Sequence, residues 1–275
     1  MTQWPEHNPQ FDDRINNPPT SALGEFARLL LGLGLVTTVV ALLLIAAAGR
    51  LSPLIPFAWE AQITSNLNFK NTDSEALEAL ETLGQALAAH AGMDEAIELH
   101  FHLLDSNTPN AFATLGGHVV VTRGLIKQVE SENGLAMVVG HEIAHIHHRD
   151  PIRQLGRGAV LSLVWALLTG GTGQTGLEQV LGTGGMLGML RYSREMEREA
   201  DTLALDLLQA HYGHTNGADE FFRAISDGLE RDARLEFLQT HPLTQSRLQT
   251  IAEGGDMDGE LHPLPETLAR WAEKD

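Results

Sequence analysis

The chain has 275 residues, of which 43% are hydrophobic and 20% are charged, so it can form a packed core and is not disordered throughout. Its 36 acidic and 18 basic residues give a formal net charge of −18, which argues against a nucleic-acid partner because phosphates require a basic surface. The absence of cysteine excludes disulfides, thiolate metal sites and cysteine nucleophiles. The 13 histidines remain as abundant side chains that can bind metals or transfer protons.

The N-terminal region divides into a tail, an apolar span and a linker. Residues 1–28 are rich in Pro, Asn, Gln and Asp without an apolar period, which predicts a disordered tail. Residues 29–48 contain no charge and could cross a bilayer core of about 30 Å as a helix. A cleaved signal peptide is the alternative, but the acidic, proline-containing stretch before the span disfavours it. We expect a single uncleaved transmembrane helix, followed by a linker over residues 49–69.

The next elements alternate between helix and strand patterns. Asp73 or Thr72 can cap a helix that runs to about Ala91. Residues 97–104 alternate as a strand, with His100 and His102 on the face toward solvent. Residues 110–115 and 118–122 resemble a hairpin around two glycines, and helix signals dominate from residue 124. The pattern predicts an α+β fold, mainly helical, with a small β-sheet.

The chemistry is concentrated in the sequence VVGHEIAHIHHRD at residues 138–150. His141 and His145 are four residues apart, so on a helix both imidazoles face one side and can bind one metal ion. Glu142 follows the first histidine and is placed to act on a water molecule. A metal-free, histidine-rich helix face is the alternative, but the apolar residues around the motif would make unpartnered polar side chains costly to bury.

A catalytic zinc needs a third protein ligand, which the sequence offers on a later helix. A histidine six residues after His145 would define one class of zinc enzyme, but that position is Pro151. Glu197 and Asp201 lie four residues apart in YSREMEREAD, so Glu197 can bind the metal while Asp201 accepts the free N–H of a ligating histidine. A solvated helix face is the alternative, and Glu195 and Glu199 compete for the ligand role.

These motifs together resemble the M48 family of zinc metallopeptidases over residues 70–255, leaving residues 256–275 as a C-terminal extension. The matching segments are HExxH at 141–145, ExxAD at 197–201, the strand and turn at 110–125, and the H-P-x-x-x-x-R element formed by His241, Pro242 and Arg247. The resemblance implies one zinc ion held by His141, His145 and Glu197, with Glu142 as catalytic base. It also implies that His241 lies over the site, where it could stabilise an oxyanion or act as a latch.

The resemblance and the residues together predict a membrane-anchored zinc endopeptidase that cleaves unfolded or misassembled proteins. The segment formed by Asn110, Ala111, Phe112 and Ala113 would be an exposed edge strand that pairs with an extended substrate. The alternative is a non-proteolytic, membrane-tethered chaperone or assembly factor on a latched protease scaffold. A structural zinc domain is disfavoured because such sites usually have four ligands, commonly thiolates.

Three further expectations concern location and two unusual segments. Basic residues are nearly balanced on the two sides of the apolar span, so only the resemblance favours a bacterial inner membrane with a periplasmic catalytic domain. Residues 159–168 are apolar over ten positions, which favours a buried or interfacial helix over a second membrane span. The glycine-rich residues 170–188 indicate a mobile loop or loose hairpin.

Overall fold

The computed structural model describes residues 21–65, 67, 69, 73–169, 192–227, 241–242, 245–256 and 258–274. The chain forms two compact units, residues 1–44 and 45–275. The expectations for residues 1–20 and for the glycine-rich segment 170–188 fall outside the described residues.

The apolar span is part of helix α1 (Ala22–Leu51), which is longer than predicted at both ends. Residues 22–28, expected in a disordered tail, are helical, since Ser21 begins the helix by accepting a hydrogen bond from Gly24. Within the described residues, the segment Ala22–Leu54 alone is long and apolar enough to cross a membrane. The expected linker over 49–69 is largely helical too, because it contains the end of α1, the 3₁₀ turn η2 (Ser52–Leu54) and helix α2 (Phe57–Thr64).

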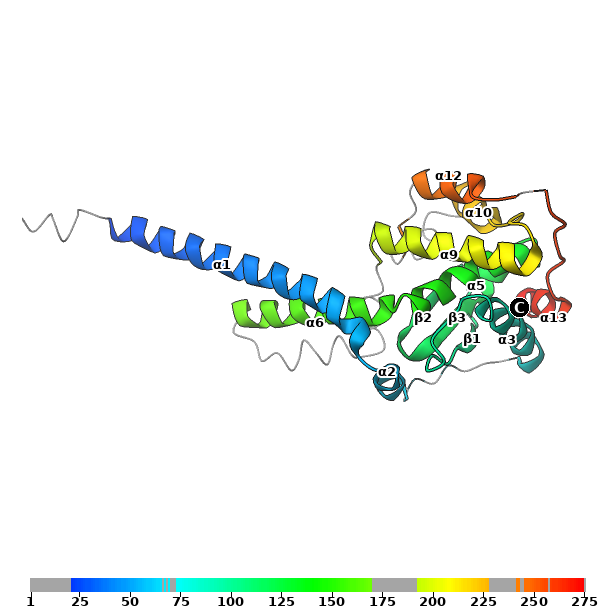
Figure 1. Cartoon of the computed structure of the whole chain (residues 1–275), viewed down its shortest axis with the longest axis horizontal. Helices are drawn as coiled ribbons and strands as arrows, with labels where there is room; N and C mark the ends of the chain where they lie inside the picture. Colours follow the sequence, from blue (N-terminus) through cyan, green and yellow to red (C-terminus); the bar gives the residue numbers. More distant parts are fainter. Residues whose placement is uncertain are drawn as a thin grey trace, which may run out of the picture. The chain divides into compact units, whose positions relative to one another are not determined.

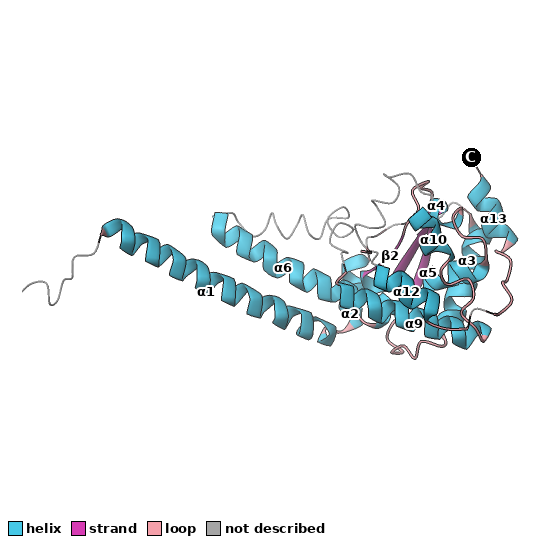
Figure 2. Cartoon of the chain, turned by 90° about the horizontal axis from the view of Figure 1, so that it is seen from above, coloured by secondary structure: helices cyan, strands magenta, loops and turns pink. Residues whose placement is uncertain are grey.

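A three-stranded sheet lies within the second unit (Figure 2). Its strands are β1 (His100–Leu104), β2 (Ala111–Thr114) and β3 (His118–Thr122), in the order β1-β3-β2. The predicted hairpin is present: β2 pairs antiparallel with β3 across the short turn η3 (Leu115–Gly117). Both turn glycines have positive φ, which explains the glycine pair. Strand β1 starts three residues later than predicted and pairs parallel with β3.

Helices pack against this sheet and against one another. Helix α3 (Ser74–Ala88) is capped by Asp73, as predicted, and contacts β1 and helix α5 (Glu132–His147). Helix α9 (Arg194–Tyr212) lies along α5, as Figure 1 shows, and helices α10 (Glu220–Asp227) and α12 (Gln245–Glu253) contact this pair. The mainly helical α+β architecture is therefore confirmed.

The C-terminal residues complete the same core rather than extending from it. Helix α13 (Glu266–Glu273) packs against α3 and the short helix α4 (Arg123–Ile126), and its Leu268 and Trp271 are buried. Arg123 donates a hydrogen bond to the Lys274 carbonyl at 2.8 Å. Residues 258–274 are thus integrated into the second unit, although the sequence motifs end before them.

Helix α6 (Asp150–Thr169) contains the apolar stretch expected to be buried or interfacial. Leu161 and Leu163 on this helix are more than half exposed, so the stretch is not buried in the described part of the chain. The described residues of α6 do not form a second candidate membrane span.

Candidate metal centre

Two helices place the predicted chemistry in the interior of the second unit. Helix α5 carries His141, Glu142 and His145, and its residues from 133 to 146 are all buried. Ser131 caps α5 by accepting from the Gly134 N–H. Helix α9 carries Glu197 in its first turn, and Glu197 is buried as well. The two helices pack closely, so their facing sides bring the two motifs together.

Four buried side chains converge so that one ligand atom of each lies within 4.8 Å of the others: His141, His145, Glu197 and His241. The two Nε2 atoms of His141 and His145 are 3.1 Å apart. Glu197 carboxylate oxygens lie 3.5 Å from His141 Nε2 and 3.7 Å from His145 Nε2. Ligands that bind one zinc ion at about 2.0–2.2 Å lie roughly 3–4 Å apart, so these side chains fit a shared metal ion.

Each histidine of the HExxH motif is oriented by a carboxylate on its other ring nitrogen. His141 Nδ1 lies 3.0 Å from Asp201 Oδ1, and His145 Nδ1 lies 2.9 Å from Asp150 Oδ2. An ionised carboxylate can only accept, so each Nδ1 carries a proton and each Nε2 is directed toward the shared site. The sequence predicted this pairing for Asp201. It missed Asp150, which lies outside the HExxH and ExxAD motifs.

Arg247 organises the two carboxylates of α9. Its Nη1 lies 2.5 Å from Glu197 Oε2, and its Nε and Nη2 donate to the two Asp201 oxygens at 2.7 and 2.8 Å. The arginine is 2% exposed, so these charged contacts are shielded from water. Arg247 therefore fixes Oε2 of Glu197, while Oε1 faces His145 and His241. The sequence placed Arg247 in a motif without giving it this task.

Glu142 is fully buried, and neither of its carboxylate oxygens has a hydrogen-bond partner within the described residues. His241 Nε2 lies 3.5 Å from Oε1. A buried carboxylate without hydrogen bonds is costly, so the residues around Glu142 must leave room for a polar ligand or a positive charge. The site fits a divalent metal for two reasons. The Glu142 carboxylate lacks hydrogen-bond partners among the described residues, and the nearby donors are imidazole nitrogens and a carboxylate oxygen.

The charges of the site are strongly coupled. Burial lowers the pKa of His141, but the hydrogen bonds to Asp201 and Glu197 outweigh it and raise this pKa to about 10. Burial and the nearby His141 hold the pKa of His145 well below its usual value. Burial raises the pKa of Asp150 to about 6. The carboxylates thus attract one positive charge even without a metal, and a divalent cation can take its place.

Strand β2 is an edge strand next to α5, as predicted, but it is not exposed. Asn110, Ala111, Phe112 and Ala113 are all buried. Tyr192, just before α9, stacks on His145 with 3.8 Å between ring centroids and donates its hydroxyl to the Ala113 carbonyl at 3.2 Å. The expectation of an open edge fails because Tyr192 packs with Phe112 and bonds the Ala113 carbonyl. Nothing in the sequence singled out Tyr192.

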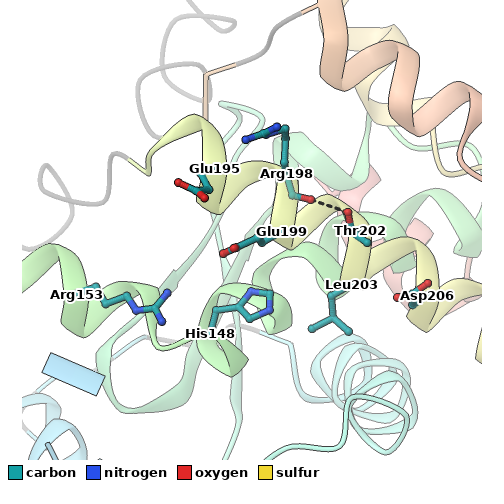
Figure 3. A pocket seen from close by; sticks show the side chains of 8 residues that line it. All are labelled: His148, Arg153, Glu195, Arg198, Glu199, Thr202, Leu203 and Asp206. Carbon is teal, nitrogen blue, oxygen red and sulfur yellow. Dashed lines mark hydrogen bonds between the residues drawn. The ribbon is translucent and has the colours of Figure 1, made fainter. Parts of the chain in front are cut away.

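The two other glutamates considered as metal ligands, Glu195 and Glu199, do not lie in the histidine cluster. Glu195 and Glu199 are exposed and line a separate groove, together with His148, Arg153, Arg198, Thr202, Leu203 and Asp206 (Figure 3). Of the three candidate glutamates, only Glu197 joins the histidine cluster. The groove follows the solvent face of α9, because its lining residues repeat at three- and four-residue intervals.

Comparisons with known proteins agree with this geometry. The family "Peptidase family M48" matches residues 75–254. The "Beta-barrel assembly-enhancing protease" of Escherichia coli (strain K12) is 31% identical over 195 residues, which are 67% of this chain and 39% of that protein. The protein of the same name from Yersinia pestis is 32% identical over 196 residues, covering 68% and 40%.

A mitochondrial relative has a similar sequence identity. The "Mitochondrial metalloendopeptidase OMA1" of Schizosaccharomyces pombe is 31% identical over 170 residues, which are 61% of this chain and 49% of that protein. The chain spans about two fifths of the length of the assembly-enhancing proteases that it matches. The family match covers the helices that hold the metal cluster and the strand beside them, and the chain belongs to peptidase family M48.

Proposed function

We propose that this protein is a zinc-dependent endopeptidase that hydrolyses peptide bonds of unfolded or misassembled proteins and is anchored in a membrane by α1. The observation that carries the proposal is the buried cluster of His141, His145 and Glu197 beside a carboxylate, Glu142, that has no hydrogen-bond partner among the described residues. A purely structural metal site would not need such a carboxylate, whereas hydrolysis needs a base.

In this proposal His141, His145 and Glu197 hold one zinc ion, with Asp201 and Asp150 orienting the two imidazoles. Zinc supplies a Lewis acid that polarises the peptide carbonyl and acidifies the attacking water. Glu142 takes the proton of that water and delivers it to the leaving amine. The proposed catalytic region is residues 70–255, and the burial of Trp271 adds α13 to the unit that supports it.

His241 is proposed as a latch on this site. Its Nδ1 lies 3.4 Å from His141 Nε2 and 3.1 Å from Glu197 Oε1, which places it among the metal donors. A catalytic zinc keeps one position open, so a fourth protein ligand would block it. His241 must then move away before a substrate can bind. The same position favours the second candidate function, a membrane-tethered assembly factor whose protease site stays closed.

Substrate is proposed to bind as an extended strand alongside β2. Among the described strands, β2 has β3 on one side only, and it packs on the metal-carrying helix α5, so a peptide added to its other side would run near Glu142. Tyr192 now holds the Ala113 carbonyl, so this pairing requires the tyrosine hydroxyl to leave. Strand pairing reads the backbone rather than side chains, which suits unfolded substrates of many sequences.

The relatives' names support a role in protein quality control in a cell envelope or organelle. We propose a bacterial inner membrane with the catalytic unit on the periplasmic side. Reporter fusions after Asp275 test the orientation: a reporter active only outside the cytoplasm should be active. Activity of a cytoplasmic reporter in its place would reverse the proposed orientation.

The catalytic proposal is tested with the full chain in detergent, by zinc content and by cleavage of unfolded casein. Glu142→Gln should retain the zinc content of wild type and lose about 100- to 10,000-fold in cleavage rate. Glu195→Gln is the matched control, since Glu195 lies on the solvent face of α9 and should leave both unchanged. A wild-type chain that binds zinc but does not cleave would favour the assembly factor. Cleavage by Glu142→Gln at the wild-type rate would refute the assignment of the base.

A further inference from the structure

A second group of histidines lies on the sheet, apart from the buried group of His141, His145, Glu197 and His241, which we call the α5–α9 cluster. Strands β1 and β3 run parallel, and their register pairs His100 with His118. His100 and His102 flank the buried Phe101, so both point away from the core on the same side of the sheet. His118 joins them from the neighbouring strand. We call these three residues the strand histidine cluster.

In the strand histidine cluster, the His118 ring lies close to the rings of both His100 and His102. His102 Nε2 and His118 Nδ1 are 2.9 Å apart. The centroid of the His118 ring lies 5.0 Å from that of His100 and 5.1 Å from that of His102. Two nitrogens bound to one zinc ion at about 2.0–2.1 Å are roughly 3.3 Å apart, so only a small ring rotation is needed for His102 and His118.

The position of each ring limits what the cluster can do. His102 and His118 are half-buried, and the Phe69 ring packs against His102, tilted by 30°, with 4.3 Å between ring centroids. His102 Nδ1 is buried without a hydrogen-bond partner within the described residues. His100 is exposed, so its side chain is free to turn toward the other two. The site thus has two fixed nitrogen donors, one adjustable donor and an open side toward water.

The protonation state also suits metal binding. Burial and the neighbouring histidines lower the pKa of His102 to about 4, and burial and His100 lower that of His118 to about 4. Both imidazoles are therefore neutral near pH 7, which is the form that binds metals. A metal ion would take the place of the hydrogen bond that the neutral rings of His102 and His118 share. Imidazole-rich sites favour Zn²⁺, Cu²⁺ and Ni²⁺ over Mg²⁺ or Ca²⁺.

We propose that His100, His102 and His118 form a second metal site, which binds one late first-row divalent ion such as Zn²⁺ and ties β1 to β3. His100 and His102 supply two ligands from β1, and His118 supplies the third from β3. A water molecule fills the remaining coordination position of the metal. Strand β1 lies at the edge of the sheet opposite β2, the strand proposed to bind substrate. Metal binding by the strand histidine cluster is therefore independent of the proposed peptidase activity.

The first experiment counts metal. The full chain in detergent is equilibrated with micromolar Zn²⁺, freed of unbound metal, and analysed for zinc per chain. Wild type should hold two ions, and His102→Gln and His100→Gln should hold one. His100 is exposed, so its replacement does not threaten folding. His90→Gln replaces an exposed histidine outside both clusters and should still hold two. One ion in wild type, or two in both cluster variants, would overturn the proposal.

The second experiment locates the metal by residue. Diethyl pyrocarbonate modifies accessible neutral histidines, and mass spectrometry of the digested chain identifies them. Zn²⁺ should protect His100 and His118 from modification while His90 reacts equally with and without the metal. Glu197→Gln, which weakens the α5–α9 cluster, should show the same protection of the strand histidine cluster. Equal modification of His100 and His118 with and without Zn²⁺ would contradict the second site even where the zinc count exceeds one.

Discussion

The two histidine clusters of this protein differ in the groups that surround the imidazole rings, and these groups shift the pKa values of His141 and His102 in opposite directions. In the α5–α9 cluster, Asp201 and Asp150 orient the histidines, and the pKa of His141 rises to about 10. In the strand histidine cluster the neighbours are other histidines and Phe69, and the pKa of His102 falls to about 4. Asp201 and Glu197 thus favour the protonated form of His141, whereas burial and the neighbouring histidines favour the neutral form of His102.

The difference also concerns geometry. On a helix, ligands four residues apart lie on one face, and packing of α5 against α9 adds Glu197 from a second element. On a strand, alternate residues share a face, and the third ligand comes from whichever strand pairs with it. The helical site is buried and fixed, whereas the strand site keeps the exposed His100 adjustable. We therefore expect the helical site to bind zinc more tightly.

The largest effect should follow from removing the ligand that joins the two helices. Glu197→Gln takes away the one carboxylate ligand and leaves Arg247 facing a neutral amide. We expect zinc affinity at this site to fall more than 100-fold and casein cleavage to fall with it, as measured by zinc titration against a chelator. Glu199→Gln, on the solvent face of the same helix, is the control. Unchanged affinity in Glu197→Gln would mean that the metal binds without α9.

The carboxylates behind the histidines should have the next largest effect. Asp150→Asn removes the acceptor that fixes the His145 ring, and we expect a loss of about 10- to 100-fold in zinc affinity. Asp201→Asn should cost at least as much, because it also breaks the contact with Arg247. The same titration measures both. An Asp150→Asn variant with wild-type affinity would show that burial alone holds His145 in place.

A smaller change should come from the latch. His241→Ala removes the fourth donor from the α5–α9 cluster, so we expect casein cleavage to rise several-fold while zinc content stays at the wild-type value. Initial rates at saturating casein measure this. His262→Ala, an exposed histidine outside both clusters, serves as the control. A lower rate with retained zinc would instead assign His241 to stabilising the oxyanion.

The sequence predicted those parts of the sites that depend on spacing within one element. The i, i+4 pairs on α5 and α9 and the alternation of His100 and His102 are local patterns, and the structure retains them. The roles of Asp150 and Tyr192 depend on how α6 leaves α5 and on what covers β2, which local periodicity does not contain. The parallel pairing that brings His118 beside His102 also depends on tertiary structure, so local sequence patterns do not predict it.

The strand histidine cluster should also give the protein an acid-sensitive stability in the absence of metal. The folded-state pKa values of His102 and His118 are about 4, below the ordinary value of 6.5, so the unfolded chain binds more protons between these pH values. The contribution of these residues to stability is therefore fully present above pH 6.5 and is lost as the pH falls toward 4. Thermal unfolding of chelator-treated protein should show a smaller loss between pH 6.5 and 5 in His118→Asn than in wild type. His90→Asn should follow the wild-type curve. Identical slopes in all three proteins would mean that the two strand histidines keep ordinary pKa values, and the electrical contrast between the two clusters would disappear.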